Sequence, residues 1–313
     1  MKGYGLANVE LGVPATHRTI YKLGSLSKPF VASAVMLLVK DGKIDLDERI
    51  KSYFKGIPSA WSEVAVRHLL AHTSGIARDP PSFDPYKIQT TFEMIESAFS
   101  VPLLFRPGDA WAYSNLGYFV LAEIILRVTG SRLGDFVRET VFQPTGMGST
   151  RTTSVSDLIE SRANSYFQKG GRMHNAGDLL AMRPSSAFVS NVSDLAKWET
   201  ALRRGRILNR EIQKQMETPA SLRQGGKCPY GLGWRIAHVN GHRLVRHGGG
   251  LWCFRTEFAR YIDDGLTVIL LCNHRDANAA LLAFEVACLY EPDLADKTVD
   301  LRPDHWPDDE CGE

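Results

Sequence analysis

The strongest pattern in the chain is an apolar run close to its start, and it predicts a buried helix. The nine residues from Val31 to Val39 are all apolar except Ser33. A helix that is apolar on every side belongs to a core rather than to a surface. Asp41-Gly42 marks its end. Pro29 is compatible with a helix that begins near 25–27, because proline is tolerated in a first turn.

Segments with strand character lie at both ends of the chain. Near the start they cover 4–9 and 19–23, with a turn region at Gly12 and Pro14 between them. Toward the other end we expect strands over 232–239, 243–246, 252–262 and 266–271. Two of the turns between these strands, Asn240-Gly241 and Asp263-Asp264-Gly265, contain residues that tolerate the positive φ of hairpins.

Amphipathic segments between the two strand groups predict helices. These segments are 47–54, 64–71, 92–99, 116–128 and 133–142. Another helix is expected over 194–204, with Ser193 as its N-cap and Gly205 as its stop. A last helix over 277–290 precedes an acidic, proline-bearing end that we expect to be a loosely held tail.

The order of these elements is strands, helices, strands and helix. It predicts an α+β fold in which one antiparallel sheet, flanked by helices, is interrupted by an inserted all-helical region. We assign 1–45 and 184–291 to the sheet region, 46–183 to the helical region and 292–313 to the tail.

Composition narrows the classes of function. The 313 residues are 44% hydrophobic and 23% charged, which is ordinary for a globular protein, and the formal net charge is only +2. That charge predicts no nucleic-acid partner and no anionic membrane surface, and it is compatible with a small-molecule substrate. No apolar run approaches the ~20 residues of a membrane span, and the start shows no export signal, so we expect a cytoplasmic location.

A serine and a lysine stand three positions apart just before the apolar helix. Ser25 and Lys28 would lie on one helical face, which places an amine beside a hydroxyl. Free backbone N–H groups in a first helical turn favour negative charge on the serine oxygen. The chain has a second such pair, Ser52 and Lys55, without an apolar helix behind it, and we interpret that pair as a surface feature.

Two further clusters follow in a fixed order. Tyr113-Ser114-Asn115 precedes a predicted helix, and His247-Gly248-Gly249-Gly250 lies at a strand end. Asn115 is also a candidate cap for that helix. Three spaced motifs of this kind parallel the S-x-x-K, S-D-N and K-T-G set of β-lactamases and penicillin-binding proteins.

With 69–75 (LLAHTSG) and 230–234 (YGLGW) between these motifs, the chain resembles the serine β-lactamase superfamily over about 4–289. The branch it is most similar to is the class C-like group. That group contains class C β-lactamases, D-Ala-D-Ala carboxypeptidases, D-aminopeptidases and family VIII carboxylesterases.

Covalent catalysis on Ser25 needs a base, because an unassisted hydroxyl is a poor nucleophile. Lys28 and Tyr113 are the candidates, and since both have ordinary pKa values near 10, one of these must be lowered. The resemblance implies that Tyr113 also passes a proton to the leaving group. It further implies an oxyanion hole formed by the backbone N–H groups of Ser25 and Gly250.

The remaining motif residues are expected to bind substrate. Asn115 would donate to the substrate carbonyl or contact Lys28, and His247 would lie on the opposite wall of the cleft. Gly248 and Gly249 would let the strand backbone approach the substrate closely. No cofactor is implied. No metal site is implied either, because Leu69 and Leu70 fill the gap between His68 and His72 where a metalloprotease carries its glutamate.

Two departures from the family pattern shape the functional hypothesis. The N-terminal helix and first strand of the family have no counterpart here, which would expose a sheet edge that a homodimer could cover. His247 stands where class C β-lactamases carry lysine. We therefore expect a carboxylesterase for short-chain acyl esters. The alternatives are a β-lactamase or D-specific peptidase acting on a small amide, and a catalytically silent binding protein.

Overall fold

A four-stranded antiparallel sheet forms the centre of the computed structural model, which describes residues 1–84, 86–152, 156–178 and 183–295. Its strands stand in the order β11-β10-β9-β8. Their bounds are β8 Arg235–Val239, β9 His242–Leu251, β10 Phe254–Tyr261 and β11 Leu266–Cys272. Asn240 and Gly241 have φ values of 48° and 87°, so the first predicted hairpin is confirmed.

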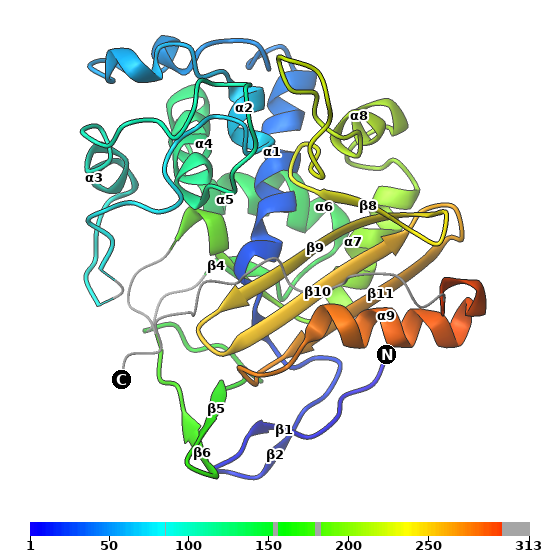
Figure 1. Ribbon diagram of the computed structural model, residues 1–313. Coiled ribbons are helices and arrows are strands. Elements are labelled where there is room, and N and C mark those ends of the chain that lie inside the picture. Colours follow the sequence, from blue (N-terminus) through cyan, green and yellow to red (C-terminus); the bar gives the residue numbers. More distant parts are fainter. Residues whose placement is uncertain (85, 153–155, 179–182, 296–313) are drawn as a thin grey trace.

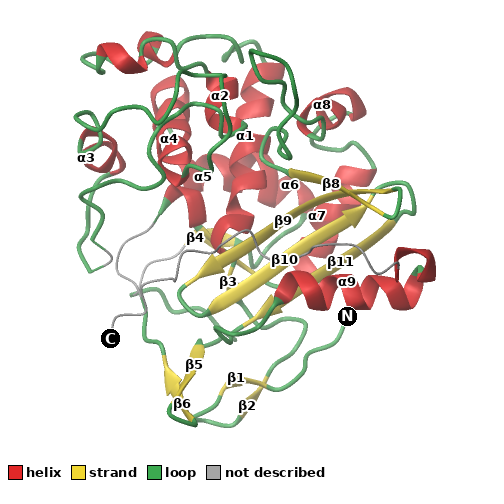
Figure 2. Ribbon diagram, in the orientation of Figure 1, coloured by secondary structure: helices red, strands yellow, loops and turns green. Residues whose placement is uncertain are grey.

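Helices cover both faces of this sheet (Figures 1 and 2). On one face α9 (Ala279–Tyr290) packs against alternate strand residues such as Leu244 and Ala259. On the other face Val245 and Phe258 belong to the main core, together with α1 (Lys28–Lys40) and α7 (Val192–Arg203). Because successive side chains of a strand point to opposite faces of the sheet, neighbouring residues of β9 and β10 belong to two different hydrophobic cores.

The long apolar run forms α1 as predicted, and this helix is the axis of the main core. Phe30 on α1 stacks against Trp198 on α7 with 4.0 Å between ring centroids, and Trp198 in turn lies 5.1 Å from the ring of Phe258. Burying one such aromatic side chain contributes roughly 1.5–3 kcal/mol. The helix that follows Ser25 is therefore held rigidly against the sheet.

The predicted α+β arrangement of helices around an antiparallel sheet is confirmed, but the remaining strands form further sheets, and some of them lie in the region that was expected to be all helical. Three of them form a separate small sheet in the order β3-β7-β4, and two hairpins pair β1 with β2 and β5 with β6. β4 and the hairpin β5–β6 lie within 46–183, where only helices were expected. The bounds are β1 Leu6–Asn8, β2 Val13–Pro14, β3 Tyr21–Lys22, β4 Arg151–Thr152, β5 Tyr166–Lys169, β6 Arg172–Asn175 and β7 Phe188–Ser190.

Most of the predicted helices are present, although several are shorter than expected. They include α2 Val66–Leu70, α3 Thr91–Glu96, α4 Asn115–Thr129 and α5 Leu133–Val137. The segment 47–54 contains only the 3-10 turn Ile50–Ser52. Two helices, α6 (Gln143–Thr145) and α8 (Arg210–Met216), were not predicted.

Two helix caps differ from the prediction. Ser114, not Asn115, caps α4, because its hydroxyl accepts the N–H of Gly117 at 3.0 Å. Asn191, not Ser193, caps α7. In both cases the capping side chain belongs to the last extended residue before the helix, as N-caps require. Asn115 is thereby released from capping and its side chain points elsewhere.

The described part of the predicted tail packs on the sheet, since Leu294 is fully buried beside Ala287 of α9. The predicted tail is described only as far as a short 3-10 helix at Pro292–Ala295, and 296–313 lie outside the described residues. β11 is an outer strand of the four-stranded sheet. In the described ranges we find no helix long and apolar enough to cross a membrane.

Candidate active site

Ser25 lies on a 3-10 turn, Gly24–Ser27, that leads directly into α1. Leu23 and Leu26 on either side of it are fully buried and anchor the turn in the main core, and Ser25 itself is 6% exposed. Ser27 fixes the turn to β7 by accepting the N–H of Phe188 at 3.1 Å. The predicted placement just ahead of the apolar helix is correct, with a 3-10 turn in place of the first α-helical turn.

Lys28 is completely buried and points at Ser25. Its Nζ lies 3.0 Å from Ser25 Oγ, 2.8 Å from Asn115 Oδ1 and 3.3 Å from the carbonyl oxygen of Ser185. Burial lowers the pKa of the amine well below its ordinary value, and the nearby Arg78 guanidinium lowers it further, whereas the Asp79 carboxylate acts in the opposite direction. The site therefore favours the neutral form of Lys28.

Tyr113 lies beside this pair. Its ring centroid is 4.7 Å from Lys28 Nζ, and its hydroxyl lies close enough to the side chain of Ser25 to affect the pKa of the phenol. Burial raises the pKa of the phenol to about 12, although the Ser25 side chain and the charges of Arg235 and Arg78 act against the rise. Tyr113 is thus a protonated phenol beside the serine.

Asn115 links Lys28 to an acidic residue that the sequence reasoning missed. Its Oδ1 faces Lys28 Nζ, while its Nδ2 donates to Asp79 Oδ1 at 2.9 Å. This second bond assigns the orientation of the amide, because a carboxylate only accepts. Asp79 follows the 69–75 motif on a loop and matches no catalytic pattern. The only sign of Asp79 in the sequence is that an acidic residue stands four positions after Gly75.

His247 is 1% exposed, and both of its ring nitrogens are engaged. Nδ1 lies 2.6 Å from the carbonyl oxygen of Gly248 and must donate to it, so Nε2 accepts from the Tyr230 hydroxyl at 2.8 Å. Burial lowers the pKa of His247 well below its usual value, and the charge on Lys28, when present, adds to this effect. The imidazole is accordingly neutral, and its ring centroid lies 6.5 Å from that of Tyr113.

The glycines after His247 bring the backbone of β9 against the serine turn. A Cβ on Gly249 would lie 1.9 Å from the carbonyl oxygen of Leu23, and a Cβ on Gly24 would lie 2.9 Å from the backbone of Gly250. Gly24 also has φ +56°, in the region that favours glycine. The two segments can approach this closely only because both lack side chains.

His72, within the 69–75 motif, holds the wall behind Tyr113. Its ring stacks on Tyr113 with 4.2 Å between centroids, and its Nδ1 accepts the N–H of Ser114 at 3.1 Å. His68 has a separate role, since its Nδ1 accepts the N–H of Ala65 at the start of α2. Within the described ranges we find no group of three or more His, Cys, Asp or Glu that could hold a metal ion.

The structure thus brings together the serine, lysine, tyrosine and asparagine that the motifs predicted, and places the β9 glycines against the serine turn. The contributions that sequence reasoning missed are those of Asp79, the Ser185 carbonyl and the edge-to-face contact between His72 and Tyr230, whose ring centroids are 4.5 Å apart. His72 and Tyr230 belong to the 69–75 and 230–234 motifs, to which the sequence assigned no role.

Comparisons with known proteins identify relatives of the same architecture. The family model described as Beta-lactamase matches residues 1–289. Penicillin-binding protein 4* of Bacillus subtilis (strain 168) is 28% identical over 294 residues, which cover 87% of this chain and 65% of that protein. The chain therefore spans slightly less than two thirds of the length of this curated relative.

Two solved structures extend the likeness. The octameric penicillin-binding protein homologue from Pyrococcus abyssi is 27% identical with a TM-score of 0.82, covering 93% of this chain and 70% of that chain. D-amino acid amidase from Ochrobactrum anthropi SV3, in complex with L-phenylalanine, is 26% identical with a TM-score of 0.78, covering 92% and 87%. This protein therefore belongs to the β-lactamase family, which confirms the resemblance that its motifs indicated.

Proposed function

We propose that the protein is a serine hydrolase that forms a covalent acyl-enzyme on Ser25 and acts on small amides or peptides of D-amino acids. The nucleophile, its base and the proton donor are contributed by the serine turn, the start of α1 and the loop before α4. The proposal depends first on the protonation state of Lys28.

The hydrogen bonds around Lys28 carry the proposal. A neutral amine has two N–H donors and one lone pair. Asn115 Oδ1 and the Ser185 carbonyl oxygen can only accept, so they take the two donors. The lone pair is left facing Ser25 Oγ at 3.0 Å, where it can accept the hydroxyl proton as the oxygen attacks a carbonyl. This geometry, with the lowered pKa, favours Lys28 as the base of the acylation step.

Tyr113 suits the second proton transfer. As a protonated phenol beside Ser25, it can donate to the leaving nitrogen or oxygen and then be reprotonated from Lys28. The negative charge on the carbonyl oxygen would be held by the N–H groups of Ser25 and Gly250, each worth about 3–4 kcal/mol in such a role. General acid–base help of this kind contributes roughly 10²–10⁴-fold.

The substrate class is supported by the relatives and by the charges near Tyr113. One of the relatives is a D-amino acid amidase. The guanidinium carbons of Arg78 and Arg235 lie 5.4 and 5.6 Å from the Tyr113 ring centroid. Positive charge in this position favours the peptides of this substrate class, which carry a carboxylate, over the simple amides, which do not.

A carboxylesterase for short acyl esters is the second candidate. His247 favours this candidate. Both of its ring nitrogens are hydrogen-bonded and its ring is neutral, so no cation stands where class C β-lactamases carry lysine. Ester hydrolysis would use the same serine and the same base.

A substrate panel with two serine variants tests the proposal. We expect hydrolysis of D-alanine p-nitroanilide but not of its L-enantiomer, and labelling by a fluorophosphonate probe. Ser25→Ala should abolish both. Ser52→Ala is the matched control, because it changes the serine of the second S-x-x-K pair on the surface and should alter neither.

Each outcome of the panel has a definite meaning. Labelling that survives in Ser25→Ala would refute the nucleophile. Turnover confined to p-nitrophenyl acetate and butyrate would replace the amidase by the carboxylesterase, and turnover of nitrocefin would replace it by a β-lactamase. If no substrate is turned over and the probe does not label Ser25, the protein is a binding protein on the same fold.

A further inference from the structure

A charged cavity lies at the far end of β9 from the serine turn. It has a volume of about 360 Å³, and its walls come from α7, α8 and the strands β9, β10 and β11. Arg243 and His247 are four residues apart on the same face of β9, so their backbones are separated by about 13 Å at ~3.3 Å per residue. The cavity is therefore a second feature, separate from the group around Ser25.

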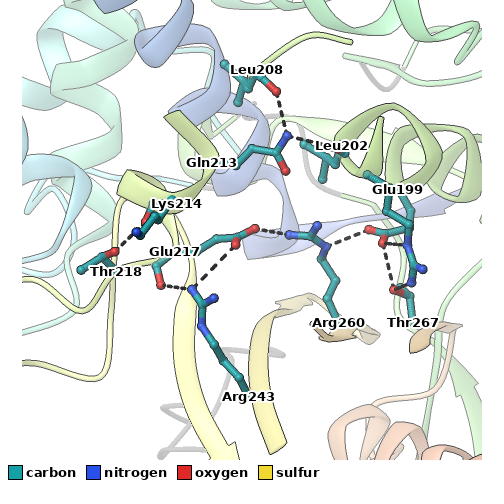
Figure 3. Close-up of polar contacts among 11 residues, drawn as sticks. Glu199, Leu202, Leu208, Gln213, Lys214, Glu217, Thr218, Arg243, Arg260 and Thr267 are labelled. Atoms are coloured by element: carbon teal, nitrogen blue, oxygen red, sulfur yellow. Dashed lines mark hydrogen bonds and ion pairs between the residues drawn. The ribbon is translucent and has the colours of Figure 1, made fainter. Parts of the chain in front are cut away.

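An ion network forms the floor of this cavity (Figure 3). Arg260, 4% exposed, donates to Glu199 at 2.8 Å and to Glu217 at 2.5 Å. Arg203 donates to Glu199 at 2.5 Å, and Arg243 donates to the backbone carbonyl of Glu217 at 2.9 Å. Arg243 also pairs with the Glu217 carboxylate at 3.8 Å, so three guanidinium groups share two carboxylates.

Two more cations line the opening. Arg210 and Lys214 are exposed, stand four residues apart on one face of α8 and take no ion-pair partner among the described residues. With them the lining carries five cationic and two anionic side chains, an excess of three positive charges. Nothing else in the lining offsets this excess.

The network also leaves hydrogen-bond donors unused. Each guanidinium has five N–H groups. Four guanidinium nitrogens donate no hydrogen bond to any described residue. They are Nη1 of Arg203, Nη2 of Arg260, and Nε and Nη1 of Arg243. Forked donors of this kind match the oxygens of phosphates and carboxylates.

The cavity walls are fixed before any ligand arrives. Gln213 on α8 donates to the carbonyl oxygens of Leu202 and Leu208, both at 2.7 Å, and so locks the connection between α7 and α8 (Figure 3). Thr267 on β11 donates to Glu199 and accepts from Arg203, which fixes the opposite wall. A site held in this way loses little entropy on binding.

We propose that this cavity binds a small oxyanion that carries two or more negative charges, such as a pyrophosphate or a tricarboxylate. The anion would accept from the unused guanidinium donors on the floor and be enclosed by Arg210 and Lys214. Its charge would neutralise the excess that the two glutamates leave.

Calorimetric titration of the full chain with inorganic pyrophosphate and, separately, with citrate tests the proposal. At low ionic strength we expect saturable one-to-one binding of at least one of them, and the pair distinguishes phosphate from carboxylate recognition. Arg210→Gln/Lys214→Gln should weaken binding at least ~10-fold, since each charge about 4 Å away contributes roughly fivefold even in water. Both residues are exposed, so the fold should be unaffected.

A matched variant separates a site from general attraction. Lys169→Gln/Arg172→Gln removes the same charge from the exposed β5–β6 hairpin and should leave the affinity unchanged. Absence of binding by both anions, or equal losses in the two double variants, would overturn the proposal. Binding should also persist in Ser25→Ala, so this test does not depend on the proposed catalytic function.

Discussion

The two ends of β9 show two different ways to bury basic groups. At the His247 end the bases are a lysine and histidines, and burial lowers the pKa values of Lys28, His72 and His247. At the Arg243 end the bases are arginines, and Arg260 and its neighbours pair with Glu199 and Glu217. Burial disfavours the charge of the lysine and histidines at one end, whereas the buried arginine at the other end keeps its charge and is paired with carboxylates.

The difference follows from the residue types. Lysine and histidine can lose their proton when desolvation disfavours the charged form, and the neutral group that results can act as a base. Arginine keeps its charge in a protein, so a buried arginine needs carboxylates or an anionic ligand. The first arrangement is suited to chemistry, and the second to structure and to binding anions.

Removing Arg260 should give the largest effect on stability. Arg260→Met leaves Glu199 and Glu217 buried with fewer partners, and breaking a buried ion pair costs about 3–5 kcal/mol. We expect the free energy of unfolding, measured in urea, to fall by about this amount. The turnover of the remaining folded protein should be unchanged, because Arg260 touches no residue around Ser25.

Arg138→Met is the control for this change. Arg138 pairs with Asp135 and Glu139 on an exposed surface, where ion pairs contribute about 0–1 kcal/mol. Equal losses in the two variants would mean that the network at the Arg243 end is not a buried, compensated one.

Removing the Tyr113 hydroxyl should give the next largest effect, on rate alone. Tyr113→Phe keeps the ring stacked on His72 but removes the proton donor, so we expect kcat/KM to fall at least ~10²-fold with the thermal stability nearly unchanged. Tyr118→Phe is the matched control, since its hydroxyl donates to the Leu70 carbonyl rather than to Ser25. Near wild-type rates in Tyr113→Phe would leave Lys28 to carry both proton transfers.

Much of the His247 end was predictable from sequence because its residues lie in short motifs next to periodic elements. Ser25 and Lys28 precede an apolar helix, and Tyr113 and Asn115 begin another. The Arg243 end was not predictable. Its members come from α7, α8 and three strands, and no spacing in the chain relates Glu199 to Arg260 before the fold brings them together.

The fold divides in the same way. Long periodic segments such as α1, α4 and α9 were predicted close to their observed bounds. Other elements were missed, such as β7 and α8. The segment of β3 was predicted as a strand, but its pairing with β7 in a separate sheet depends on tertiary contacts rather than on a local pattern. Asp79 is missed for a related reason: it lies on a loop and acts through Asn115.

Asp79→Asn should have the smallest effect on activity. It tests whether the lowered pKa of Lys28, at the His247 end, matters for the reaction. The Asp79 carboxylate raises the pKa of Lys28, against the effect of burial, so its neutralisation should lower that pKa further. If neutral Lys28 is the base, activity is lost as pH falls through this pKa, and the acid limb of kcat/KM should move to lower pH in Asp79→Asn. The hydrogen bond from Asn115 can persist, because the new amide oxygen still accepts. Asp109→Asn, which removes a carboxylate paired with Arg223, should leave the limb in place. An acid limb that does not move in Asp79→Asn would mean that a group other than Lys28 titrates in the reaction.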